Sequence, residues 1–296
     1  MNSRITHFLR LIAPLALTLG VTAQDAAAQS APLTLQVYNA DANSFHVNAV
    51  LVSGKTDAVL LDTGFTRADA MRIAAMVLDS KKMLKTIYIS QADPDYYFGI
   101  DVLKQYFPDA QVVTTAATLK KIQATLATKL QVWGPRMGSN APRAVPLPAV
   151  LEGNSITLEG EKLEIRGLDD SQPHRSYVWI PSLKTIAGGV NVYGGLHLWT
   201  ADAQSVQERA DWSRKLGVMA ALQPVTVIPG HSLPGTPQDA SQIVWSQAYL
   251  ARFEAELPKA ADSAALIAAM RAAYPNAGLL VALDIGAKVN KGEMKW

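Results

Sequence analysis

Residues 90–99 read Ser-Gln-Ala-Asp-Pro-Asp-Tyr-Tyr-Phe-Gly, and no other stretch of the chain is as informative about its fold. The apolar run at 86–89 before it is typical of a buried strand. The residues after it, 100–106, have the pattern of a helix. The stretch is therefore a loop at the end of a strand, and it holds two carboxylates, Asp93 and Asp95, only two residues apart.

The chain before this loop predicts antiparallel strands followed by a helix. Strands are expected at 33–38, 45–53 and 58–61, where apolar and β-branched residues are separated by short polar breaks. Thr66 has a side chain suited to an N-cap, which predicts a helix from 67 to about 80.

The chain after the loop again predicts strands followed by helices. Its patterns predict strands and helices in turn: strands at 111–114, 155–158, 162–167, 177–180, 185–187 and 225–228, and helices at 116–130, 203–222, 237–257 and 262–273. Residues 133–148 are rich in glycine and proline and predict a long irregular loop, which is either a lid or wall facing the substrate or a disordered segment. Two halves of this kind predict an α/β (α+β) fold, a four-layer αββα sandwich with its sheets face to face.

Composition sets limits on the function. The chain has 296 residues, of which 49% are apolar and 18% charged, as in folded globular proteins. A net charge of +2 without a large cluster of lysine and arginine argues against nucleic acid as a partner. Since the chain has no cysteine, thiolate metal ligands, disulfides and a lipid anchor on cysteine are excluded.

The first residues predict export. Residues 1–28 combine basic side chains, an apolar run at 11–21 that is too short to cross a bilayer, and a small-residue cleavage site before Gln29. A periplasmic or secreted protein with no stable membrane anchor after cleavage is expected, and the alternative is a retained anchor. Residues 29–296 are expected to form a single domain with a C-terminal helical extension.

Together, several motifs resemble those of the metallo-β-lactamase fold superfamily. They are the strand end Leu61-Asp62-Thr63-Gly64, the loop at 90–99, and a strand that ends in Pro229-Gly230-His231. The segment 177–185 also resembles an exported bacterial branch of that superfamily. The resemblance covers about residues 33–257, and it implies a site at the shared edge of two sheets. Working members hold one or two zinc ions with five histidines and two aspartates.

Most of these ligands are replaced here. The resemblance places Gln91 and Asp93 on two histidine positions, Asp95 on an aspartate position, Tyr96 on a third histidine position and His231 on a late histidine. Asp169 or Asp170 takes the place of the middle histidine, His174 follows it, and Gly189 stands where the bridging aspartate belongs. The resemblance thus implies Asp95 and His231 as catalytic residues, a metal set of Asp93, Asp95, Tyr96 and His231, and a cleft with Gln91, Asp62, Asp170, His174 and Gly189.

This ligand set has consequences for the cofactor. Zinc prefers imidazole and thiolate ligands, whereas carboxylate and phenol oxygens suit Mn, Fe(III), Mg or Ca better. The sequence therefore predicts either no metal or one weakly bound divalent or trivalent ion in place of the expected zinc. Two residues keep a second interpretation: Asp62 is also suited to cap a strand end, and His231 to serve as a general acid or base or as an ordinary loop histidine.

Two functions remain open at this stage. The favoured one is a hydrolase-like protein that has lost zinc hydrolysis and binds a small-molecule ligand or a partner in the old cleft. The alternative is an exported hydrolase of esters, lactones or β-lactams that uses an altered, oxygen-rich metal site. A serine hydrolase is disfavoured, because the chain has no Gly-x-Ser-x-Gly elbow. The oligomeric state is left open.

Overall fold

The computed structural model describes Met1 and residues 32–296. Apart from Met1, the expected signal peptide at 1–28 lies outside these residues, so its cleavage stays a prediction. Among the described helices, none combines the length and the apolar character that a membrane span requires.

The N-terminal half forms the larger sheet. Its strands lie in chain order and are β1 Thr34–Asn39, β2 Asn48–Ser53, β3 Asp57–Leu61, β4 Met83–Ile89, β5 Gln111–Thr114 and β6 Ala149–Val150. The pairs from β1 to β3 are antiparallel and those from β3 to β6 are parallel. Its helices are α1 Arg67–Ser80, α2 Pro94–Tyr97, α3 Ile100–Tyr106 and α4 Ala116–Met137. The expected start of α1 is confirmed: Thr66 caps it, in a capping box with Asp69.

The C-terminal half forms a smaller sheet. Its strands lie in the order β12 Thr226–Val227, β10 Thr185–Ala187, β9 Tyr177–Ile180, β8 Glu161–Arg166 and β7 Ser155–Leu158. A short parallel pair joins β11 Tyr193–Gly194 to β13 His231–Ser232. The helices of this half are α5 Val206–Ala221, α6 Ser241–Glu256, α7 Ser263–Ala273 and α8 Leu280–Asn290.

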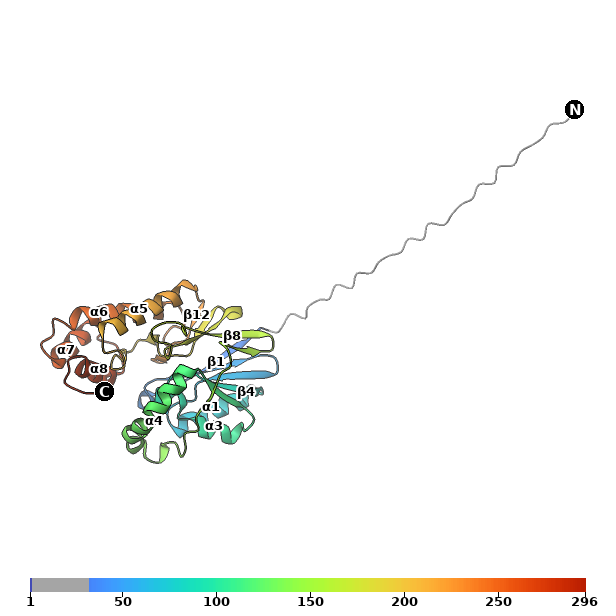
Figure 1. Ribbon diagram of the computed structural model, residues 1–296, viewed down its shortest axis with the longest axis horizontal. Coiled ribbons are helices and arrows are strands. Elements are labelled where there is room, and N and C mark those ends of the chain that lie inside the picture. The colour runs from blue at the N-terminus through green and yellow to red at the C-terminus, as the bar shows by residue number, and fades with distance from the viewer. Residues whose placement is uncertain (2–31) are drawn as a thin grey trace. The chain divides into compact units, whose positions relative to one another are not determined.

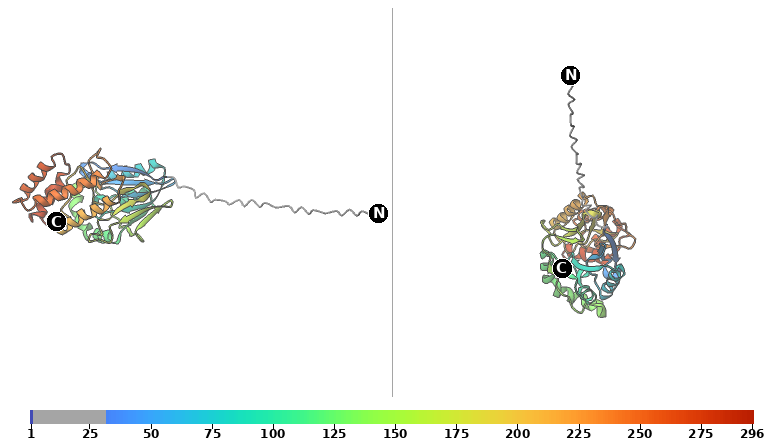
Figure 2. Two further views of the ribbon diagram at one scale, coloured as in Figure 1. Left: turned by 90° about the horizontal axis from the view of Figure 1, so that it is seen from above. Right: turned by 90° about the vertical axis from the view of Figure 1, so that its right-hand side faces the viewer.

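Three apolar cores separate four layers. One core lies between the sheets, where side chains such as Val52 on β2 and Val178 on β9 meet. A second core packs the other face of the larger sheet against α1, α3 and α4, and a third packs the smaller sheet against α5 and α6. Figure 1 shows these helices on the outer sides of the two sheets. The predicted αββα sandwich is therefore confirmed. Figure 2 shows the red C-terminal helices at one end of the strands.

Helix α4 corrects one prediction. It does not end near residue 130 but continues to Met137, through Gly134 and Pro135, so the irregular segment is shorter than expected. The reason is tertiary packing: Trp133 is only 7% exposed, and its ring lies 5.2 Å from that of Phe45 and 5.8 Å from that of Phe65. Burial of a tryptophan outweighs the low helix propensity of the two residues after it.

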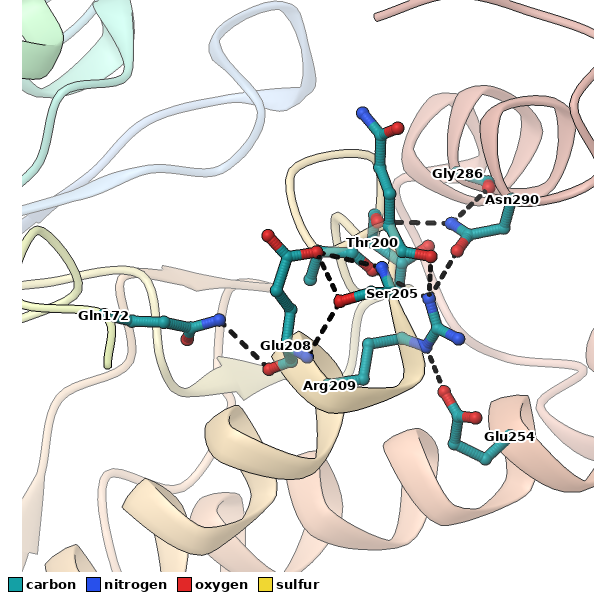
Figure 3. A network of polar contacts seen from close by, with 10 residues as sticks. Gln172, Thr200, Ser205, Glu208, Arg209, Glu254, Gly286 and Asn290 are labelled. Carbon is teal, nitrogen blue, oxygen red and sulfur yellow. Dashed lines mark hydrogen bonds and ion pairs between the residues drawn. The ribbon is translucent and has the colours of Figure 1, made fainter. Parts of the chain in front are cut away.

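A buried polar network fastens the C-terminal helices to the rest of the fold (Figure 3). At its centre, the guanidinium of Arg209 on α5 forms an ion pair with Glu254 on α6 and donates to the side-chain oxygen of Asn290 on α8 at 2.5 Å. Asn290 in turn donates to the Thr200 carbonyl at 3.2 Å. A buried charge must be paired in this way, and the network fixes the end of the chain, where Trp296 packs against Trp199 at 5.3 Å.

Candidate functional site

A small cavity of about 40 Å³ brings together the loop after β4 and the start of β13. Its walls are mainly aromatic, with the rings of Phe45, Trp133, Tyr193, Trp199 and Trp296. Four ionisable side chains also line it: Asp93, Asp95, Lys129 and His231. The lining, apolar with a few convergent polar groups, resembles that of a small-molecule site, but the cavity by itself has room for only a few water molecules.

Asp95 and His231 meet in this cavity, as the sequence predicts. The Nε2 atom of His231 lies 3.4 Å from Oδ2 of Asp95. The other ring nitrogen, Nδ1, lies 2.9 Å from the carbonyl oxygen of Phe45 and must donate to it, because a carbonyl only accepts. The neutral imidazole therefore presents the lone pair of Nε2 to Asp95.

Burial disfavours the charged form of both members of this pair. It lowers the pKa of His231 to about 4. It also raises the pKa of Asp95 well above its ordinary value, and the charge of Asp93 adds to the effect. Burial thus favours the form of the pair in which a carboxylic acid faces an unprotonated imidazole, and this form can donate and accept hydrogen bonds without carrying net charge.

Asp93 is held by a cation from the protein itself. Nζ of Lys129 on α4 lies 2.6 Å from Oδ1 of Asp93 and donates to the Ala92 carbonyl at 3.2 Å. Burial alone would raise the pKa of Asp93, but the charges of Lys129 and Lys121 lower it to about 2. Burial would likewise lower the pKa of Lys129, but Asp93 raises it. The ion pair is therefore fully charged at neutral pH.

Two tyrosines enclose the histidine. Tyr193 stacks on the His231 ring with centroids 5.1 Å apart, and Tyr96 meets the ring edge-on at 5.6 Å. The Tyr96 hydroxyl is buried and has no hydrogen-bond partner among the described residues. Burial, followed by the charge of Asp95, raises the pKa of Tyr96 well above its ordinary value, so the phenol keeps its proton.

Three residues expected in the cleft lie behind its wall instead, and this corrects the prediction. Gln91 turns back on its own loop, where its side-chain oxygen accepts the Ala92 N–H at 2.6 Å. Asp62 accepts from the backbone N–H and hydroxyl of Ser90 at 2.8 and 2.6 Å, and burial raises its pKa to about 7. The N–H of Gly189 donates to the same hydroxyl at 2.7 Å. These contacts support the loop from beneath.

The residues expected near the position of the family's middle histidine also lie away from the cavity. Asp170 is exposed, forms an ion pair with Lys215 at 3.0 Å and accepts the Gln172 N–H at 2.8 Å. His174 is partly buried, and burial, together with Lys121 and Arg175, lowers its pKa to about 4. Neither side chain lines the cavity, because the ion pair with α5 draws this loop toward the helix.

Comparison with known proteins settles the family. The model of the metallo-beta-lactamase superfamily matches residues 42–231. The chain belongs to the metallo-β-lactamase superfamily. Among solved structures, a metallo-beta-lactamase from Pontibacter korlensis is similar, with a TM-score of 0.53, 18% identity, and coverage of 75% of this chain and 96% of that one. A metallo-beta-lactamase family protein from Thermus thermophilus gives a TM-score of 0.61 at 15% identity and covers 88% and 92% of the two chains. A search of curated proteins gives no match.

The side chains of this superfamily member do not fit a zinc centre. In the part of the chain that the structure describes, no group of three or more histidine, aspartate or glutamate side chains could hold a metal ion. Asp93 is already neutralised by Lys129, and Tyr96 is a buried neutral phenol, whereas metal ligands are bound in their deprotonated form.

The place of the bridging aspartate is closed by the backbone. Gly189 has φ +77°, and a Cβ added to it would lie 2.2 Å from the Ser176 carbonyl oxygen. The facing glycine, Gly230, is equally confined: its Cβ would lie 2.3 Å from the Gly189 carbonyl oxygen and 2.5 Å from the Tyr96 hydroxyl. No carboxylate can therefore enter at position 189 unless this backbone moves.

Sequence reasoning missed Lys129 and Trp296. A usable signal for Lys129 existed, because Lys129, Trp133 and Arg136 recur at the spacing of one helix face. Ending the predicted helix near 130 concealed it. For Trp296 the sequence carries no comparable signal, since it reaches the cavity through its packing against Trp199.

Proposed function

We propose that this protein binds a small organic molecule in the cleft made of the small cavity and a larger groove that shares Lys129, Trp133 and Trp296 with it, and does not hydrolyse substrates with zinc. The ion pair between Asp93 and Lys129 carries the proposal, because it gives the carboxylate of the old metal site a permanent cation from the protein. Export to the periplasm or beyond, expected from residues 1–28, is part of the same proposal.

The lining favours a ligand with a neutral polar group on an aromatic or apolar body. In its protonated form, which burial favours, Asp95 offers a hydrogen-bond donor, and Nε2 of His231 offers an acceptor. Lys129 spends two of its three N–H donors on Asp93 and Ala92, which leaves one for a ligand. An amide, a hydroxyl or a carbonyl would match these groups, and the aromatic walls would enclose the rest.

One observation favours the alternative, a hydrolase with an altered metal site. Asp95 and His231 still face the cavity side by side, as two retained ligand positions would. For an ion to bind there, Asp93 would have to break its ion pair with Lys129 and bind the metal instead. Asp95 would have to be deprotonated. Turnover of an ester, a lactone and a β-lactam, each with and without added Zn, Mn and Fe(III), separates the two functions.

The binding proposal is tested with benzamide, which carries a neutral amide on an aromatic ring. In the presence of EDTA, we expect a saturable change in tryptophan fluorescence. Asp95→Leu should weaken benzamide binding about two- to ten-fold, since it removes one hydrogen-bonding group. Asp79→Asn, an exposed change on α1, serves as the control and should leave the affinity unchanged. Hydrolysis that appears only with added metal would contradict the proposal and support the alternative, as would benzamide binding that is lost with EDTA.

A further inference from the structure

A larger groove of about 700 Å³ adjoins the cavity and shares Lys129, Trp133 and Trp296 with it. One face of α4 forms a side of this groove, because its lining residues recur at helical spacing from Lys121 to Arg136. The C-terminal segment around Trp296 lines it as well. A ligand seated in the cavity would therefore extend into this groove.

The groove carries an excess of positive charge. Four cations line it, Lys121, Lys129, Arg136 and Lys295, against two carboxylates, Asp202 and Glu208; because Lys129 is already paired with Asp93, the excess is one positive charge. Both carboxylates already accept hydrogen bonds, Asp202 from the Trp296 indole at 3.2 Å and Glu208 from the Ser205 hydroxyl at 2.9 Å. Within residues 32–296, the ammonium groups of Lys121 and Lys295 have no ion-pair or hydrogen-bond partner.

The cations flank a space that small side chains leave open. Between Lys121 and Lys129 the lining face of α4 has only alanine and threonine, at 124, 125 and 128. Eight residues of helix span about 12 Å, so an extended Lys121 side chain can reach a group that also accepts the one N–H that Lys129 has left beside Asp93 and Ala92. On the far side of Lys129 the groove turns aromatic, with Trp133 and Trp296.

We propose that this groove binds a small organic anion, with its charged group between Lys121 and Lys129 and its aromatic body toward Trp133 and Trp296. The inference rests on the proposed function, because it names the class of molecule that the cleft takes. Charge complementarity selects the anion, since the unpaired cations repel a positive ligand and gain a partner from a negative one. The aromatic side chains supply the apolar contact area.

The experiment compares three naphthalene probes that differ in charge: 2-naphthoate, neutral 2-naphthylmethanol and cationic 2-naphthylmethylamine. In calorimetric titrations with EDTA, we expect 2-naphthoate to bind at least about five-fold tighter than the alcohol, and the amine to bind most weakly. Raising the ionic strength from about 0.01 M to about 0.15 M shortens the Debye length from about 30 Å to about 8 Å. Of the three affinities, only that for the anion should fall.

A pair of neighbouring variants isolates the groove. Lys121→Gln should lower the affinity for 2-naphthoate about three-fold and leave the affinity for the alcohol unchanged, since one exposed charge pair contributes up to about 1 kcal/mol. Lys120→Gln is the matched control, because Lys120 precedes it on α4 but does not line the groove. Equal affinity for anion and alcohol, a preference for the amine, or no binding of any probe would overturn the inference. Benzamide binding, measured separately, would still decide the proposed function.

Discussion

Replacing Gly189 with aspartate, the residue that the family places there, is expected to lower the free energy of unfolding by at least about 2 kcal/mol. A residue other than glycine at φ +77° is strained by about 1–3 kcal/mol. The new Cβ would also lie 2.2 Å from the Ser176 carbonyl oxygen, and overpacking of this kind costs a further 1–3 kcal/mol or so. Denaturant unfolding of the variant and the wild type measures the difference.

Gly160→Asp is the control for backbone strain alone. Gly160 also has a positive φ, +90°, but nothing lies within 4 Å of the position of its Cβ. We expect it to lose about 1–2 kcal/mol. If Gly189→Asp were no less stable than Gly160→Asp, the backbone at 189 could admit a carboxylate, and the closed position argued above would be wrong.

Replacing Lys129 with methionine is expected to destabilise the protein by about 2–3 kcal/mol at pH 7. The variant keeps most of the side-chain volume but leaves Asp93 charged and without its cation. Removing one partner of a buried ion pair costs about 3–5 kcal/mol, and the partial exposure of the two side chains, 14% and 22%, reduces this. The same denaturant titration gives the value.

The pH dependence of this loss of stability shows whether it comes from the lost ion pair. With Lys129 present, the pKa of Asp93 is lowered to about 2, so the stability that the ion pair contributes is fully present above pH 4 and is lost as the pH falls toward 2. Without Lys129, burial raises the pKa of Asp93 above its ordinary value, so the gap between wild type and Lys129→Met should begin to narrow above pH 4 and narrow further as the pH falls toward 2. Adding Asp93→Asn should recover much of the loss, and Lys121→Met, on the same helix face, should change stability little. A gap that is constant with pH would point to lost packing instead.

The fold was accessible from sequence because its signals are local. The alternation of strands and helices and the cap at Thr66 predict the four layers and the start of α1. The loop at 90–99 and the motif ending in His231 each follow a strand, which predicts that Asp95 and His231 meet. These features depend on spacing along the chain and on where strands end.

The polar contacts of the site were not accessible in the same way. Asp62 and Gln91 sit at motif positions, but their side chains bond to the nearest backbone or hydroxyl groups and not to the cavity. Asp170 turns to Lys215, a partner from a helix far along the chain. Lys129 lies within the helix that the sequence predicts, but its partner Asp93 is 36 residues away in the chain, and local propensity cannot predict a tertiary contact of this kind.

The central claim is that this member of the metallo-β-lactamase superfamily satisfies its old metal site with its own side chains. The most direct test is the zinc content of the purified wild-type protein, measured by inductively coupled plasma mass spectrometry after dialysis against metal-free buffer. A zinc site needs three or four well-placed nitrogen, sulfur or oxygen ligands, so we expect well under about 0.1 zinc per chain. About one zinc per chain would contradict the claim, since Asp93 would then have to release Lys129 and bind the metal.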